Sequence, residues 1–146
     1  MHRKLLLLLL LAVPLLSIAQ AATAEIAEVN TRFGGAIVFK LDRRQQLVMD
    51  HHDANGRYRQ DVVPVEHLDI DATTVSLSEH AVVLTCRADR PQCISKELFA
   101  QNAVRMTGRS ALALPPGDAD GAATLDAVRA LIAAAQARLA TNETRR

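Results

Sequence analysis

Apolar and polar residues alternate with a period of two over much of the chain, and this pattern predicts short strands. Asn55-Gly56 is the strongest turn signal among them, because both residues tolerate a positive φ. Strands are expected at 36–41, 45–52, 58–65, 66–71, 73–78, 81–86 and 110–115. Such close spacing without helices between the strands predicts an antiparallel meander of six or seven strands.

The apolar period changes to 3.6 residues near the C-terminus, which predicts an amphipathic helix over 122–140. Asp118 or Asp120 is expected to cap its start. Laid on the sheet, this helix would give an α+β domain. Residues 95–99 suggest a helical turn capped by Ser95, whereas 25–30 fits either a short helical turn or a disordered segment. The order of 97–109 does not follow from the sequence.

The first 24 residues have the pattern of a secretory signal peptide. A basic start is followed by an apolar run over 5–18 and by small residues up to Ala24. The alternative is a membrane anchor, but the run is shorter than the ~20 apolar residues that a spanning helix needs. No later segment is apolar enough to span a bilayer, so we expect a soluble periplasmic or secreted protein. The expected divisions are a signal peptide at 1–24, one domain at 25–140 and a solvated tail at 141–146.

Charge and aromatic content argue against nucleic-acid binding. After cleavage at Ala24, 15 basic residues would face 16 acidic ones, a net charge of −1 with histidines neutral. A nucleic-acid binder needs a basic surface, and single strands also need aromatic stacking platforms. The remaining aromatic residues are only Phe33, Phe39, Tyr58 and Phe99.

Cys86 and Cys93 are the two cysteines of the chain, and three roles are open to them. An exported chain meets oxidising conditions, which favours a disulfide across a short hairpin. Closing this eight-residue loop would stabilise the fold by ~2.5 kcal/mol. A redox pair would need the CxxC spacing, and a zinc site would need two further ligands.

Two histidine clusters are candidates for metal binding. Asp50 to Asp53 reads DHHD, and both carboxylates and imidazoles bind zinc or copper. His51 and His52 would point to opposite faces of a strand, so they would converge only if the hairpin tip distorts. His67 and Asp69 share one face of the expected strand at 66–71. The alternative for these residues is the polar side of a half-buried strand.

The stretch VVLTCRADRPQCI, followed by a strand and by DADGAATLDAVRALI, resembles small secreted bacterial proteins of uncharacterised function with a pleckstrin-homology-like fold. The resemblance implies a partly open barrel covered by one C-terminal helix. It also draws attention to Lys40, Arg43 and Arg44, because the phosphoinositide site of pleckstrin-homology domains uses basic residues around the first hairpin. An ordinary charged turn is the alternative. The tryptophan that those domains carry in the last helix is absent here.

Motifs for catalysis are missing from the sequence. It contains no GxSxG, HExxH, SxxK or glycine-rich phosphate loop, so we expect neither catalytic residues nor a cofactor. A triad defined only by geometry stays open. The sequence favours an exported binding module whose sheet edge takes up a protein or peptide. The alternative is a periplasmic zinc- or copper-binding protein that uses His51, His52, His67 and nearby carboxylates such as Asp69.

Overall fold

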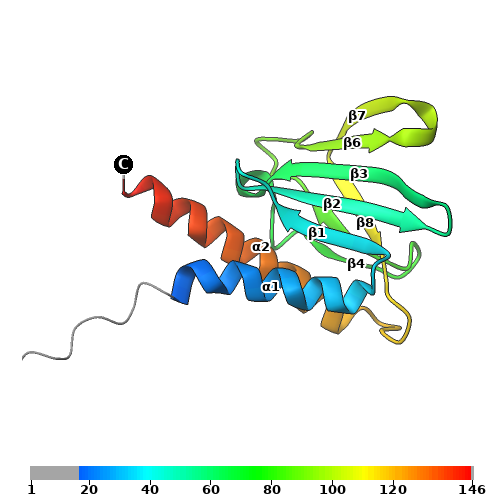
Figure 1. Ribbon diagram of the computed structural model, residues 1–146, viewed down its shortest axis with the longest axis horizontal. Coiled ribbons are helices and arrows are strands. Elements are labelled where there is room, and N and C mark those ends of the chain that lie inside the picture. The colour runs from blue at the N-terminus through cyan, green and yellow to red at the C-terminus, as the bar shows by residue number, and fades with distance from the viewer. Residues whose placement is uncertain (1–16, 146) are drawn as a thin grey trace, which may run out of the picture.

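Eight antiparallel strands and two long helices form an α+β fold in the computed structural model, which describes residues 17–145 (Figure 1). One sheet has five strands in the order β1-β2-β3-β6-β7, and the other has three in the order β4-β5-β8. The strands are β1 (Ile37–Leu41), β2 (Gln46–Asp53), β3 (Gly56–Pro64), β4 (Thr74–Ser76), β5 (Ala81–Thr85), β6 (Ile94–Leu98), β7 (Ala103–Thr107) and β8 (Arg109–Ala113). The predicted α+β class, with a partly open barrel and a C-terminal helix, is confirmed. Most of the expected signal peptide lies outside the described residues.

The predicted hairpin at Asn55-Gly56 is confirmed, with its loop one residue earlier than the dipeptide. Asp53 pairs with Gly56, so Ala54 and Asn55 form the two-residue loop. Gly56 has a φ of 109°, a value that side chains disfavour. The Asp53 Oδ1 atom accepts a hydrogen bond from the Asn55 N–H at 2.7 Å, which closes the turn.

Helix α2 (Ala122–Glu143) follows the predicted apolar face and runs three residues past the expected domain end at 140. Asp120 and Asp118 both cap its first turn, by accepting hydrogen bonds from the N–H groups of Ala122 and Thr124. The buried residues of the helix are Thr124, Ala127, Val128, Leu131, Ile132 and Ala135. The helix therefore contributes its apolar stripe to the core, as the 3.6-residue period indicates.

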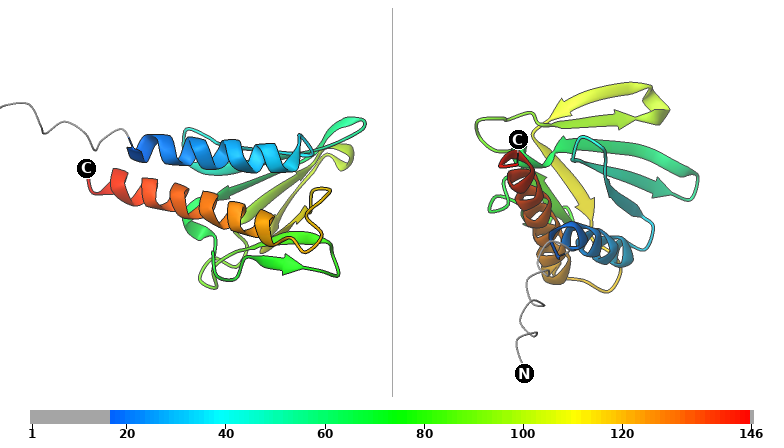
Figure 2. Two further views of the ribbon diagram at one scale, coloured as in Figure 1. Left: turned by 90° about the horizontal axis from the view of Figure 1, so that it is seen from below. Right: turned by 60° about the vertical axis from the view of Figure 1, so that its left-hand side comes forward.

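Helix α1 (Ser17–Phe33) is a second helix, much longer than the single turn considered for residues 25–30. It lies beside α2, and the two views of Figure 2 show the pair against one side of the sheets. Val29 and Phe33 are buried, and the Phe33 ring contacts that of Phe39 with centroids 5.2 Å apart. Contacts with the rest of the fold therefore hold a segment whose own apolar content does not specify a helix.

Two local predictions are wrong because distant pairing overrides local preference. Residues 66–71 are not a strand, since β3 ends at Pro64 and a 3₁₀ turn, η1 (Val65–His67), follows. After it, only Leu68 pairs with another strand region, in a single bridge to Cys86. The helical turn expected at 95–99 is strand β6, which pairs with β3 on one side and with β7 on the other. A second 3₁₀ turn, η2 (Phe99–Gln101), then leads into β7.

The disulfide between Cys86 and Cys93 is confirmed, but the hairpin expected across it is wrong. Cys86 follows β5 of the three-stranded sheet, whereas Cys93 precedes β6 of the five-stranded sheet. The bridge therefore joins the two sheets at the point where the chain passes from one to the other.

The chain returns to the three-stranded sheet at the same corner, through Gly108 between β7 and β8. The Gly108 carbonyl accepts a hydrogen bond from the Cys86 N–H at 2.9 Å. A Cβ atom at residue 108 would overlap the Pro91 carbonyl oxygen of the disulfide loop, so the close approach requires glycine. The disulfide therefore holds the start of β6, and the contacts of Gly108 hold the end of β7.

Candidate functional site

Strand β7 is an open edge of the five-stranded sheet. It pairs with β6 alone, and no other hydrogen bond between backbone groups joins residues 103–107 to the described chain. None of its side chains is fully buried, and Val104 and Met106 are 64% and 51% exposed. An edge strand of this kind offers unpaired N–H and C=O groups to another extended chain.

The other sheet edges are bonded or short. On β1, Asn30 of α1 donates through Nδ2 to the Phe39 carbonyl oxygen at 3.0 Å. Its Oδ1 accepts from the Phe39 N–H at 2.7 Å, so one side chain takes both backbone groups of the middle residue of β1. On β8, the Ala111 carbonyl oxygen accepts from Arg59 Nη2 at 3.1 Å, while β4 has only three residues. Strand addition is therefore easiest at β7.

The outer face of β7 borders a groove of about 750 Å³. Val62, Ser95 and Met106 form one side of it, in a cross-strand row over β3, β6 and β7. Residues 89–93 of the disulfide loop form the other side. The groove combines apolar side chains with a wall that the disulfide holds in place.

On the inner face, one cross-strand row runs from the apolar core to the open edge. Phe39 pairs with Met49, and the row continues through Asp61 and Lys96 to Arg105. Neither Lys96 nor Arg105 has a hydrogen-bond or ion-pair partner among the described residues. Burial lowers the pKa of Lys96; nearby Asp61 raises it, and Arg59 and Arg109 lower it further.

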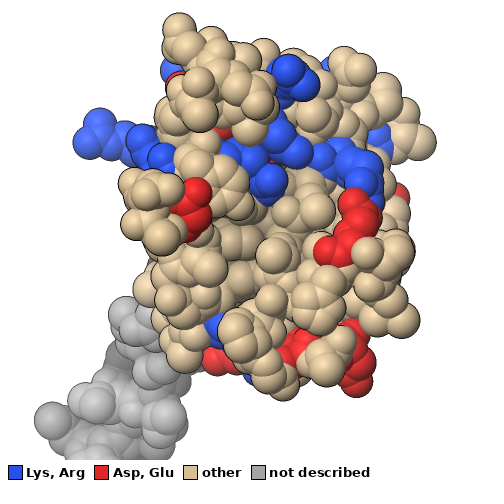
Figure 3. All heavy atoms as spheres, turned by 90° about the vertical axis from the view of Figure 1, so that its right-hand side faces the viewer, with Lys and Arg blue, Asp and Glu red and all other residues tan. Residues whose placement is uncertain are grey.

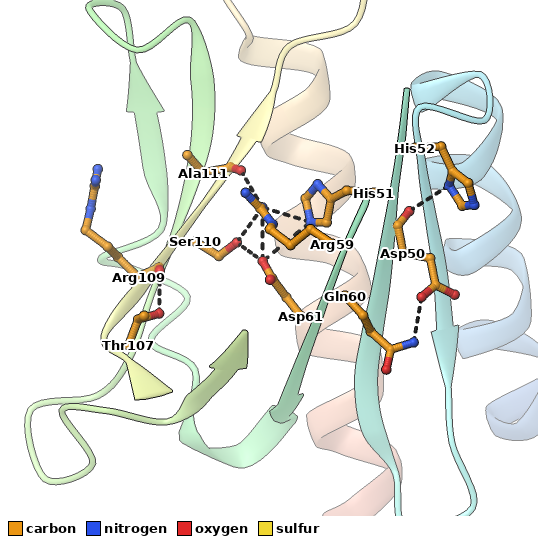
Figure 4. A network of polar contacts seen from close by, with 10 residues as sticks. All are labelled: Asp50, His51, His52, Arg59, Gln60, Asp61, Thr107, Arg109, Ser110 and Ala111. Carbon is orange, nitrogen blue, oxygen red and sulfur yellow. Dashed lines mark hydrogen bonds and ion pairs between the residues drawn. The ribbon is translucent and has the colours of Figure 1, made fainter. Parts of the chain in front are cut away.

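Arg59 holds a buried polar network between the two sheets, and Figure 4 shows His51, Arg59 and Asp61 directed toward β8. Its Nη2 atom lies 3.0 Å from Asp61 Oδ2 and 2.9 Å from His51 Nε2. It also lies 3.3 Å from the Ser110 hydroxyl and 3.1 Å from the Ala111 carbonyl oxygen. The Ser110 hydroxyl donates a short hydrogen bond to Asp61 Oδ2. Asp61 is fully buried, yet the ionised side chain has a charged partner and a hydrogen-bond donor.

The Nε2 atom of His51, which is 2% exposed, lies 2.9 Å from Arg59 Nη2 and 3.4 Å from Asp61 Oδ2. The closer partner is an arginine, which can only donate, so this contact favours a neutral ring that accepts at Nε2 and carries its proton on Nδ1. Burial lowers the pKa of His51 and the charges of Arg59 and Lys96 act in the same direction, against the effect of Asp61. The Ser110 hydroxyl bonds Asp61 rather than an imidazole nitrogen, so this arrangement does not present an activated nucleophile.

Beside this network, a pocket of about 250 Å³ opens between the sheets. His51 and Arg59 line it, together with Glu79 and small residues that include Ala111 and Ala113. Glu79 is already bonded to Arg109, with 2.5 Å between Oε2 and Nη2. Figure 3 shows Lys and Arg side chains gathered in a band across the end of the molecule on the right of Figure 1.

The structure does not bring the predicted metal ligands together. His51 is buried against Arg59, whereas the Nδ1 atom of the half-buried His52 lies 3.2 Å from the Asp50 carbonyl oxygen (Figure 4). His67 ends η1, and Asp69 accepts a hydrogen bond from the Ala72 N–H in the following turn. Within residues 17–145, no group of three or more His, Cys, Asp or Glu is placed to hold a metal ion.

The three basic residues of the first hairpin are also separate. Lys40 lies on β1, where its Nζ bonds Asp50 Oδ2 at 2.9 Å. Arg43 and Arg44 are exposed in the turn before β2, with no side-chain partner in the described chain.

The features of β7 were not identified from the sequence. The stretch AVRMT over 103–107 alternates apolar and polar residues, which is a strand signal, but it is short and follows a segment with helical preference. The Arg59 network joins residues about 50 positions apart, and a single sequence contains no sign of such a contact.

Comparisons with protein-family models, curated proteins and solved structures found no match for this chain. The resemblance to secreted proteins of pleckstrin-homology-like shape therefore stays a prediction. Of the helices in the described part of the chain, none combines the length and apolar character needed to cross a bilayer.

Proposed function

We propose that this protein is an exported, non-catalytic binding module that takes up an extended segment of a partner protein beside β7. The single observation that supports this most is the free backbone of a five-residue edge strand with two exposed apolar side chains. An added strand gains affinity from main-chain hydrogen bonds and specificity from alternate side chains. The proposed place of action is the periplasm or the extracellular space.

Two further features support strand addition at this position. The groove beside Met106 offers partly apolar surface to side chains of the partner. The disulfide and the Gly108 contact fix the base of the hairpin, and Arg57 lies over the Phe99 ring near its tip, at 4.6 Å from the centroid. A preformed edge loses little conformational entropy when it binds.

The test uses a neutral, strand-forming heptapeptide, TTVQVTT, at millimolar concentration. We expect peptide-dependent NMR shifts and slower amide exchange in residues 103–107 of the isotope-labelled, disulfide-bonded protein. The double variant Val104→Lys/Met106→Lys should weaken binding, because lysines on an edge strand oppose further pairing. Leu77→Lys is the matched control, since Leu77 is an exposed apolar residue of the β4–β5 turn, 72% accessible.

If binding leaves residues 103–107 unchanged, or if the Leu77→Lys control weakens it as much as the β7 variant, the proposal is wrong. Failure of the neutral peptide and of its acidic and basic counterparts to bind would also overturn it.

A further inference from the structure

We propose that the segment added to β7 carries an acidic side chain opposite Arg105, with an apolar residue on each side of it. This inference rests on the proposed function and specifies the ligand of the same site. The evidence is the register of the sheet, the charges on its inner face and the exposed side chains on its outer face.

The register places the acidic residue. Arg105 ends the inner-face row that includes Asp61 and Lys96, so the next strand would contribute the next member of this row. Cross-strand neighbours have Cβ atoms about 4.5–5.5 Å apart and point to the same face. A carboxylate at that position can reach the Arg105 guanidinium, and its charge lies near Lys96.

The charges of the surroundings determine which side chain is favoured there. Asp61 is ion-paired with Arg59, and Glu79 is ion-paired with Arg109. His51 is neutral while it accepts from Arg59. Two cations on this face, Lys96 and Arg105, then have no ion-pair partner among the described residues, and the Asp61 carboxylate near Lys96 is already paired with Arg59.

The remaining charged residue of β6 does not change this balance. Glu97 pairs with Val104, and both lie on the outer face, away from the row of Arg105. Figure 3 shows a band of Lys and Arg side chains across this end of the molecule, with Asp and Glu side chains beside and below the band. The uncompensated cations favour a carboxylate over a neutral or basic side chain.

Strand alternation determines the neighbours of the carboxylate. The residues before and after it would point to the outer face, opposite Val104 and Met106. Both side chains are mostly exposed in the free protein, so apolar neighbours would bury surface on both partners. The preferred sequence is therefore apolar, acidic, apolar within an extended segment.

The experiment compares three peptides that differ only in the central residue: TTVEVTT, TTVQVTT and TTVKVTT. Dissociation constants are measured by NMR titration of the disulfide-bonded protein at low salt. We expect the Glu peptide to bind about three- to fivefold more tightly than the Gln peptide, as a cross-strand ion pair predicts, and the Lys peptide to bind most weakly. Higher salt should reduce the difference.

Charge reversal provides the matched test. In Arg105→Glu the order should invert, so that the Lys peptide binds most tightly, and Lys96→Gln should narrow the preference for Glu. Arg43→Glu is the control, because Arg43 is an exposed arginine in the β1–β2 turn.

Three outcomes distinguish the two proposals. Equal affinity of the three peptides, with shifts in 103–107, would overturn the acidic preference and leave strand addition standing. A preference for Glu that Arg105→Glu does not invert would also overturn it. If none of the peptides binds, the proposed function itself fails.

Discussion

At the scale of single residues, the most constrained group is the Arg59 guanidinium. Four contacts converge on Nη2, whereas Nε is buried without a partner. Nη2 has only two hydrogens, so its four neighbours share them. Removing either charge of the Arg59–Asp61 pair would leave the other buried and uncompensated, which typically costs about 3–5 kcal/mol.

The imidazole of His51 makes the stability of the protein depend on pH. Because the folded state lowers its pKa, the unfolded chain binds a proton more readily. The free energy of unfolding should therefore fall as the pH decreases below about 6.5, the ordinary histidine value, until the folded-state pKa is reached. His51→Gln, with a side chain that does not titrate, should lose less stability over this range.

Urea unfolding at about pH 7 and pH 5 measures this difference. His52→Gln is the control for replacing a histidine of the same strand with glutamine. Equal stability losses in wild type and His51→Gln would contradict the assignment of a neutral, buried His51. Asp50 and Asp61 become protonated at lower pH than this, because the pKa of each carboxyl group lies below the ordinary aspartate value.

At the scale of elements, the side chain of Asn30 is the contact that closes the β1 edge. Asn30→Ala would remove both hydrogen bonds to Phe39 and leave its N–H and C=O groups unpaired. We expect a loss of about 1–3 kcal/mol in the free energy of unfolding. Asn30→Asp keeps the acceptor but places a second carboxylate oxygen against the Phe39 carbonyl oxygen, so it should lose at least as much as Asn30→Ala. Urea unfolding tests the order, and an Ala variant as stable as wild type would show that this contact contributes nothing.

Periodic patterns predicted some elements well and others poorly. Helix α2 and the hairpin near Asn55-Gly56 depend on the conformational preferences of residues that are close together in the sequence, so a local pattern predicts both. Strand β6 does not follow local preferences. Ser95, Lys96 and Glu97 favour a helical turn by themselves, and they form a strand because they pair with β3 and β7.

Less of the candidate site than of the fold could be predicted from the sequence. Cys86 and Cys93 were predicted as a pair from their number and from the expected export of the chain. Which sheets they join depends on the topology of the fold, which the sequence does not show. His51 looked like a metal ligand beside His52, since nothing in the sequence places Arg59 against its ring. The free edge at β7 is a property of which strands lack a neighbour, so it exists only in the folded chain.

At the scale of the whole molecule, the expected cleavage after Ala24 would cut helix α1. Ala22 is buried and would be lost, but Val29, Asn30 and Phe33 would remain. A chain that begins at Glu25 should keep the fold and lose at least about 1 kcal/mol, the contribution of the buried Ala22 methyl group. Circular dichroism and urea unfolding of the two chains test this. An unfolded shorter chain would show that 17–24 belong to the folded domain.

The two hydrogen bonds between Asn30 and Phe39 on β1 also limit how copies of the chain could join. A fibre that grows by strand pairing needs two free edges in every copy, so that each can accept one neighbour and offer itself to the next. In the five-stranded sheet, β7 is free, whereas Asn30 occupies both backbone groups of Phe39 in the middle of β1. Self-association through this sheet is therefore favoured between two β7 edges, which would give a pair of molecules rather than a fibre.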